Sequence, residues 1–125
     1  MAATGDGAGA RGGPEVLTAE RIGLAELGRV ATLVQFSSAF CAPCRATRRV
    51  LAEVAAMVPG VEHAEIDAEE RLELTRAASV VRTPTVLVLD RAGRVVRRAE
   101  GQPRRVDVIA AVGAAADAGG AGRPG

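Results

Sequence analysis

The chain has two cysteines, Cys41 and Cys44, which are separated by two residues and lie between segments of different periodicity. The segment before them, residues 31–36, is a short run rich in apolar and β-forming residues, which indicates a strand. In the segment after them, residues 45–58, apolar residues recur at helical spacing. The cysteine pair is therefore predicted to lie at a strand-to-helix junction, around which the rest of the fold must be arranged.

The predicted position of the pair at a helix start affects the acidity of its thiols. The first amides of a helix have no intrahelical partners, and their partial positive charge favours a nearby anion. Cys41, the first cysteine of the pair, is the favoured thiolate. A thiol pKa near 7 in such a motif leaves roughly half of the groups ionised at neutral pH. Pro43 falls in the first helical turn, where its missing N–H costs little. The motif is thus suited to thiolate chemistry.

Other interpretations of the pair remain open. Cys-x-x-Cys also forms half of many zinc sites, but a tetrahedral site needs four ligands, and one chain offers only two cysteines and His63. Two chains that share a metal through four cysteines would meet that number. A purely structural disulfide is a further interpretation, although so short a loop would add little stability.

A Thr-Pro-Thr segment, with Pro84 in its middle, directly precedes a second apolar run, residues 86–89. Together with the Cys-x-x-Cys motif, it makes residues 16–116 resemble the thioredoxin family. In that family a redox-active Cys-x-x-Cys begins a helix and packs against a cis-proline that opens a later strand. The resemblance implies that Cys41 is the nucleophile, Cys44 the resolving cysteine and Pro84 the cis-proline. Taken alone, Pro84 would be an ordinary trans proline, which is the default for such bonds.

The residue patterns of successive segments predict the element order βαβαβαββα. The resemblance implies an α/β fold, a thioredoxin-like three-layer α/β/α sandwich with a central mixed β-sheet. Strands are expected at residues 16–17, 31–36, 61–67, 86–89 and 94–100. Helices are expected at residues 18–28, 41–58 and 69–78, and from Pro103 onward. Thr18 is the expected cap of the first helix. In the last helix, Val106, Ile109 and Val112 are expected to be buried.

The length of 125 residues allows one domain. We expect a flexible Gly/Ala-rich leader at residues 1–14, the domain at residues 15–116 and a flexible Gly-rich tail at residues 117–125. The net charge of +1 argues against binding of nucleic acid or of a membrane surface. The chain contains neither a secretory signal nor an apolar run of membrane-spanning length, so a cytoplasmic location is expected, while a membrane anchor upstream of this sequence stays open.

The resemblance also implies a shallow apolar groove beside the cysteines that holds an extended peptide. Its expected residues are Phe40, Ala42, Pro43, Thr83, Pro84 and Gly101. Three arginines on the outward face of the redox helix, Arg45, Arg48 and Arg49, give a further hypothesis of a partner-docking patch. The simpler interpretation is that they form a solvated helix surface.

The sequence departs from the family at positions that handle protons. Thioredoxins bury an aspartate in the central strand, where this chain has Gln35, and place its lysine partner in the next strand, where this chain has His63. The tryptophan before the first cysteine and the glycine after it are replaced by Phe40 and Ala42. His63 is a candidate for proton handling because its unperturbed pKa of about 6.5 suits the task. The alternative is a strand residue whose ring faces solvent.

The resemblance implies a protein dithiol–disulfide oxidoreductase that uses no metal and no cofactor other than its own Cys41–Cys44 disulfide. Its expected partners are disulfide-containing proteins and an upstream thiol reductant, and it is expected to be a monomer. The altered proton-handling residues favour a specialised reductase over a general one. The alternative function is a binding module that holds extended peptide segments of a partner while its disulfide stays idle.

Overall fold

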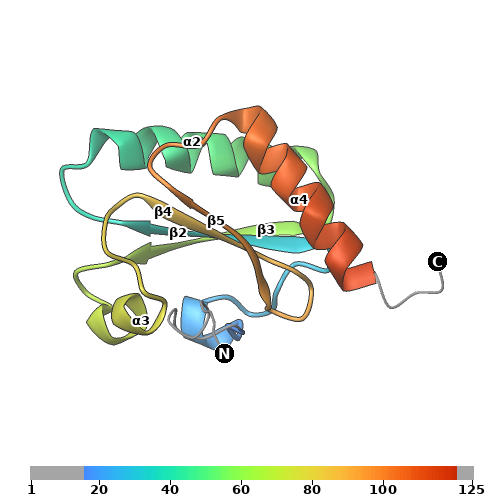
Figure 1. The fold of residues 1–125 in the computed structure, drawn as a ribbon, viewed down its shortest axis with the longest axis horizontal. Helices are drawn as coiled ribbons and strands as arrows, with labels where there is room; N and C mark the ends of the chain where they lie inside the picture. Colours follow the sequence, from blue (N-terminus) through green and yellow to red (C-terminus); the bar gives the residue numbers. More distant parts are fainter. Residues whose placement is uncertain (1–15, 121–125) are drawn as a thin grey trace, which may run out of the picture.

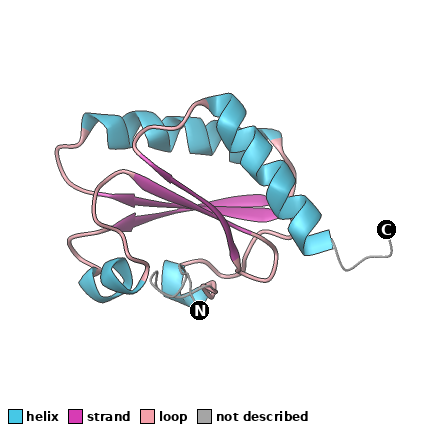
Figure 2. Cartoon of the chain, viewed as in Figure 1, coloured by secondary structure: helices cyan, strands magenta, loops and turns pink. Residues whose placement is uncertain are grey.

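A four-stranded mixed sheet forms the middle layer of the computed structural model, which describes residues 16–120 (Figure 1; Figure 2). The elements are, in chain order, the 3₁₀-helix η1 (Glu20–Ile22), β2 (Ala31–Ser37), α2 (Ala42–Met57), β3 (Val61–Asp67), α3 (Leu72–Ala77), β4 (Thr85–Leu89), β5 (Val95–Glu100) and α4 (Arg105–Gly120). The strands lie in the order β3-β2-β4-β5. β2 pairs with β3 in parallel and with β4 antiparallel, and β4 pairs antiparallel with β5.

Helices cover both faces of this sheet. α2 and α4 lie on one face, and α3 and η1 lie on the other (Figure 1). The core under α2 and α4 includes Leu33, Leu51, Val54, Val86, Val88, Val108 and Val112, and the core on the other face includes Leu17, Val34, Phe36, Ile66, Leu74, Leu87 and Leu89. These layers confirm the predicted thioredoxin-like α/β sandwich.

β2 runs through the centre of the sheet, and every one of its residues is buried. Because successive strand residues point to opposite faces, Leu33 and Gln35 lie on the face that α2 covers, whereas Val34 and Phe36 lie on the other. The alternation thereby places a polar side chain, Gln35, under the first turn of α2.

β5 is an edge strand of the sheet. It pairs only with β4 among the described strands, and Arg97 and Arg98 are exposed. Charged side chains on an edge strand oppose pairing with further chains.

None of the helices within residues 16–120 is long and apolar enough to cross a membrane.

The predicted first helix, residues 18–28, is wrong in extent, since only η1 is helical in this region. The N-cap residue of η1 is Ala19 and not the predicted Thr18, although the Thr18 Oγ1 accepts a hydrogen bond from the Arg21 amide at 3.2 Å. Gly23 then ends η1 at a φ of +81°, a left-handed conformation that a helix cannot continue. The predicted strand at residues 16–17 is a single antiparallel bridge from Val16 to Arg94.

The buried face of the last helix also differs from the prediction. Val106 is 61% exposed and Ile109 is 41% exposed, whereas Val108, Val112 and Ala115 are buried, so that only Val112 was predicted correctly. The helical segment is rich in alanine, so apolar residues occur on every side of it and their spacing does not single out one face.

Several element boundaries differ from the predicted ones. The last helix begins at Arg105 and not at Pro103, and it continues through Gly120, so residues 117–120 of the predicted tail are helical. The helix predicted at residues 69–78 is limited to Leu72–Ala77. The predicted leader and the remainder of the predicted tail, residues 1–14 and 121–125, lie outside the described residues.

Candidate redox site

The two cysteines lie between the end of β2 and the first turn of α2, as the periodicity of the flanking segments predicted. Phe40, at a φ of +57°, turns the chain, and Cys41 is the N-cap residue of α2. Pro43 occupies the first turn, where no intrahelical hydrogen bond needs its missing N–H. Cys41 and Cys44 form a disulfide with a Cα–Cα distance of 5.1 Å, within the usual range of about 4.4–6.8 Å.

The two sulfur atoms of this disulfide have different surroundings. The Cys41 Sγ accepts a hydrogen bond from the Cys44 amide at 3.2 Å, which uses one of the unpaired amides of the helix start. Cys41 is half-buried, whereas Cys44 is only 1% exposed. A partner disulfide can therefore approach Cys41 far more easily than Cys44.

The loop that carries Pro84 is joined to the loop that precedes the cysteines. The hydroxyl groups of Ser38 and Thr83 are hydrogen-bonded at 2.8 Å across 45 positions of sequence. The Thr83–Pro84 peptide bond is cis, and the Pro84 carbonyl accepts a hydrogen bond from the Gly101 amide at 2.8 Å. The Thr-Pro-Thr segment and the Cys-x-x-Cys motif thus belong to one end of the molecule.

The residues expected to form a peptide groove differ in exposure. Phe40, Ala42 and Pro43 are exposed, Thr83 and Gly101 are half-buried, and Pro84 is buried. Val81 is 81% exposed in the loop before Thr83, and it was not among the predicted groove residues. Exposed apolar side chains next to a reactive disulfide are suited to contact with a protein partner.

Gln35 is fully buried and holds the first turn of α2 against β2. Its Nε2 donates hydrogen bonds to the Cys44 carbonyl oxygen at 2.8 Å and to the Ser37 Oγ at 2.9 Å. Its Oε1 is buried and accepts no hydrogen bond from the described residues. An amide does not titrate in the physiological range, so Gln35 positions the backbone of Cys44 and is not itself an acid or a base.

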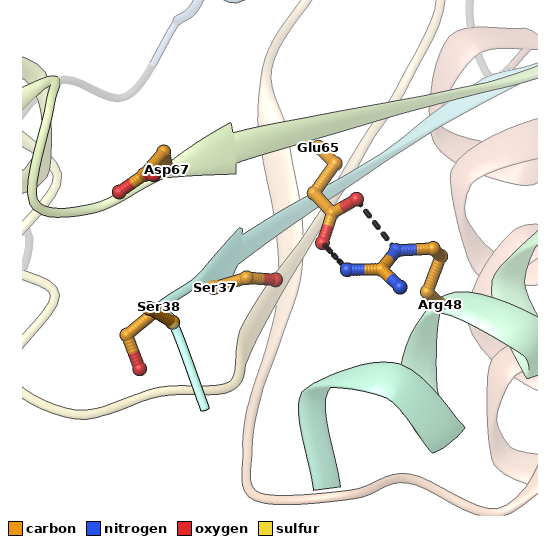
Figure 3. Close-up of a pocket in the computed structure, with 6 residues that line it drawn as sticks. Ser37, Ser38, Arg48, Glu65 and Asp67 are labelled. Atoms are coloured by element: carbon orange, nitrogen blue, oxygen red, sulfur yellow. Dashed lines mark hydrogen bonds and ion pairs between the residues drawn. The ribbon is translucent and has the colours of Figure 1, made fainter. Parts of the chain in front are cut away.

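The polar contacts of Gln35 continue to the surface through Ser37 and Glu65. Glu65 binds the Arg48 guanidinium through both carboxylate oxygens, each at 2.7 Å (Figure 3). Arg48 lowers the pKa of Glu65, and a hydrogen bond from Ser37 adds to this effect, while partial burial opposes it. A polar network therefore runs from a surface ion pair to the carbonyl group of Cys44.

Glu65 and Ser37 were not among the site residues predicted from the sequence. The available signal is the alternation of residues 61–67, since in a strand this places Glu65 on the same face as His63. It could not show that Gln35 and Glu65 are direct neighbours, because that depends on the register between β2 and β3. Of the three arginines on the helix surface, Arg48 is engaged by Glu65, and Arg45 and Arg49 are exposed.

His63 is half-buried on β3, where it pairs with Leu33, two positions away from Gln35. Its Nε2 is buried and has no hydrogen-bond partner among the described residues. Burial lowers the pKa of His63 below 6.5, although the negative charge of Glu65 partly opposes this. The neutral imidazole is therefore the favoured form at neutral pH.

Within residues 16–120, no group of three or more His, Cys, Asp and Glu side chains is arranged to hold a metal ion.

Comparison with known proteins agrees with the fold and the site. The family model "Thioredoxin" matches residues 25–114. Among solved structures, thioredoxin from Fasciola hepatica is 26% identical, with a TM-score of 0.61 and coverage of 70% of this chain and 82% of that chain. A mutant thioredoxin from Halobacterium salinarum NRC-1 is 23% identical, with a TM-score of 0.63 and coverage of 70% and 76%. Thioredoxin f from spinach chloroplast is 21% identical, with a TM-score of 0.62 and coverage of 70% and 78%.

A comparison with curated protein sequences found no match. The sandwich fold and the disulfide at the start of α2 define an α/β protein of thiol–disulfide chemistry. The chain belongs to the thioredoxin family, whose model spans most of it. It is accordingly a protein disulfide oxidoreductase of the class that acts on disulfide-containing proteins.

Proposed function

We propose that the protein is a specialised reductase of partner disulfides, with Cys41 as the nucleophile and Cys44 as the resolving cysteine. The Cys41 thiolate attacks one sulfur of the partner disulfide, which forms a mixed disulfide and releases one partner thiolate. The Cys44 thiolate then attacks the Cys41 sulfur, which forms the Cys41–Cys44 disulfide and releases the second partner thiolate. The partner gains two electrons and takes up two protons, and an upstream dithiol returns the protein to its reduced form.

The observation that carries this proposal is the difference between the two sulfur atoms. Cys41 is accessible and accepts a hydrogen bond from the helix start, whereas Cys44 is buried one turn later. The accessible and stabilised thiolate is suited to the first attack. The buried thiol can reach only a disulfide that has already formed at Cys41.

The surroundings of Cys44 support a specialised role. Gln35 contacts the Cys44 carbonyl group but cannot accept the proton that Cys44 must lose. We assign that proton to His63, acting through water, because its buried Nε2 has no partner among the described residues and burial favours the neutral ring. A base that acts through water is less effective than one in direct contact, so resolution would be slow with partners that do not assist it.

His63→Ala tests this assignment by single-turnover kinetics of mixed-disulfide resolution. We expect resolution to slow by about tenfold, less than the 10²- to 10⁴-fold of a directly positioned base. Wild type should also lose resolution rate as the pH falls through a pKa below 6.5, and the variant should lack this step. If His63→Ala resolves like wild type at every pH, the ring is a packing residue only.

Reduction of a protein disulfide by the pre-reduced chain tests the function itself. Wild type should turn over with an excess of dithiol, Cys41→Ser should be inactive, and Cys44→Ser should accumulate the mixed disulfide. Trapping with Cys44→Ser in the native cell would identify the partners. A wild-type protein that binds partners without reducing them would instead support the peptide-binding module with an idle disulfide.

We further propose that the protein acts as a monomer and needs no cofactor beyond its disulfide. The chemistry above exchanges electrons only between thiols and disulfides, so all its groups come from one chain and its partners. A reducing compartment such as the cytoplasm suits a reductase, since thiol pools there remain reduced.

A further inference from the structure

A polar pocket lies beside the redox site, at the end of the sheet where the parallel strands β2 and β3 finish (Figure 3). It has a volume of about 340 Å³ and is lined by Ser37, Ser38, Ala39, Arg48, Glu65 and Asp67. Ala39 lies two positions before Cys41, and Ser38 binds Thr83 of the neighbouring loop. The pocket therefore adjoins the surface that a partner disulfide must approach.

The charges around this pocket do not cancel. The Arg48 guanidinium binds both oxygens of Glu65, so these two groups form a neutral pair. Asp67 has no such cation among the residues that line the pocket. Its Oδ1 accepts hydrogen bonds from the Glu69 and Glu70 amides at 2.8 Å and 3.2 Å, and no hydrogen bond to its Oδ2 is found within residues 16–120. The lining consequently carries one uncompensated negative charge.

The hydroxyl groups of the pocket already contact other protein groups. The Ser37 Oγ accepts a hydrogen bond from the Gln35 Nε2, and Ser37 also helps to lower the pKa of Glu65. The Ser38 and Thr83 hydroxyls bind each other. The group that distinguishes this pocket is therefore the Asp67 carboxylate, whose charge and Oδ2, unpaired within the described part of the chain, match a positively charged donor group.

We propose that this pocket binds a lysine or arginine side chain of the partner protein, close in sequence to the partner's reactive cysteine. This inference rests on the proposed reductase function and adds a determinant of substrate choice. An acidic side chain is disfavoured because Asp67 would repel it and Arg48 is already paired. The volume lies at the lower end of the range of about 300–1,000 Å³ for ligand sites, which suits one side chain better than a cofactor.

The test uses synthetic peptides that contain one disulfide and differ at a single position next to a cysteine. That position carries lysine, norleucine or glutamate, and it is placed in turn on either side of the cysteine. Norleucine keeps the apolar stem of lysine without the charge. For one of the two positions, the kcat/KM of the reduced wild-type protein should be about fivefold higher with the lysine peptide than with the matching norleucine peptide. This ratio is the one expected of a partly exposed charge pair.

Asp67→Asn is the decisive variant, because asparagine retains the Oδ1 that accepts from the turn amides but removes the charge. We expect it to abolish the preference for lysine over norleucine. Glu62→Gln is the matched control, since Glu62 is an exposed carboxylate on the same strand but at its other end and on its other face. This control should retain the preference. Raised salt should weaken the preference in wild type, because salt screens exposed charges.

The proposal is overturned if wild type shows no preference for lysine on either side of the cysteine, if Asp67→Asn keeps the preference, or if the glutamate peptide is reduced fastest. Failure of the proposed function looks different. In that case neither wild type nor Glu62→Gln would reduce any of the peptides, the norleucine peptide included.

Discussion

The two sulfur atoms of this protein differ in their hydrogen bonds and in their burial. Cys41 accepts a hydrogen bond from the start of α2, and Cys44 lies beneath it. In the reduced protein at pH 7, iodoacetamide should modify Cys41 about tenfold faster than Cys44, because a thiol pKa near 7 instead of 8.5 raises the thiolate fraction by about that factor. Mass spectrometry after brief labelling measures the order. Earlier modification of Cys44 would contradict it.

The hydrogen bond of Gln35 can be tested by substitution with glutamate, a side chain of nearly the same size. Gln35→Glu would replace the donor that binds the Cys44 carbonyl oxygen by an acceptor in a fully buried position. We expect a loss of about 1–3 kcal/mol in the free energy of unfolding at pH 8, the cost of an unsatisfied buried group.

The pH dependence of this loss has a definite sign. Burial raises the pKa of the introduced carboxyl group, so the folded variant binds its proton more tightly than the unfolded chain does. The loss should therefore shrink as the pH falls, because the protonated carboxyl group can again donate to Cys44. Urea unfolding at pH 8 and pH 5 measures the difference. A loss that grows on acidification would contradict the assigned hydrogen bond.

Between elements, the ion pair of Arg48 and Glu65 links α2 to β3. Both side chains are partly exposed, so Glu65→Gln should reduce stability by only about 0.5–1 kcal/mol at pH 7. The pKa of Glu65 is depressed below its ordinary value of 4.5, so the stabilisation is present above that pH and is lost as the pH falls through the folded-state pKa. Wild type and variant should therefore converge in unfolding experiments below that pKa. Exposed Glu62→Gln serves as the control.

α4 offers a separate test, because Gly113 lies in its interior and is exposed. A Cβ atom added there meets no atom within 4 Å. Gly113→Ala should therefore raise the free energy of unfolding by about 0.5–1 kcal/mol, the difference in helix propensity. The contrasting variant is Gly93→Ala, which should destabilise, since Gly93 has a φ of +90° and its Cβ would lie 2.3 Å from the Leu17 carbonyl oxygen. Thermal unfolding of both variants measures the two signs.

For the whole molecule, local patterns predicted the parts that depend on neighbours in sequence. The strand-to-helix junction at the cysteines, the buried runs of β2 and β4 and the alternation of β3 are of this kind. The buried face of α4 was predicted wrongly, because alanines surround Val108 and Val112 on all sides of the helix. The network through Ser37 and Glu65 and the pocket at Asp67 depend on strand register, which no local pattern contains.

The hydrogen bond between Ser38 and Thr83 has a consequence for synthesis of the protein. A nascent chain that has emerged only as far as β3 already carries Cys41 and Cys44, but it lacks Thr83 and the strand β4 that pairs with β2 along most of its length. Chains are made from the N-terminus at about 5–20 residues per second, so this state lasts for seconds on the ribosome. During that interval both cysteines are present without Thr83 and β4, so the surface around them is complete only after β4 has paired with β2.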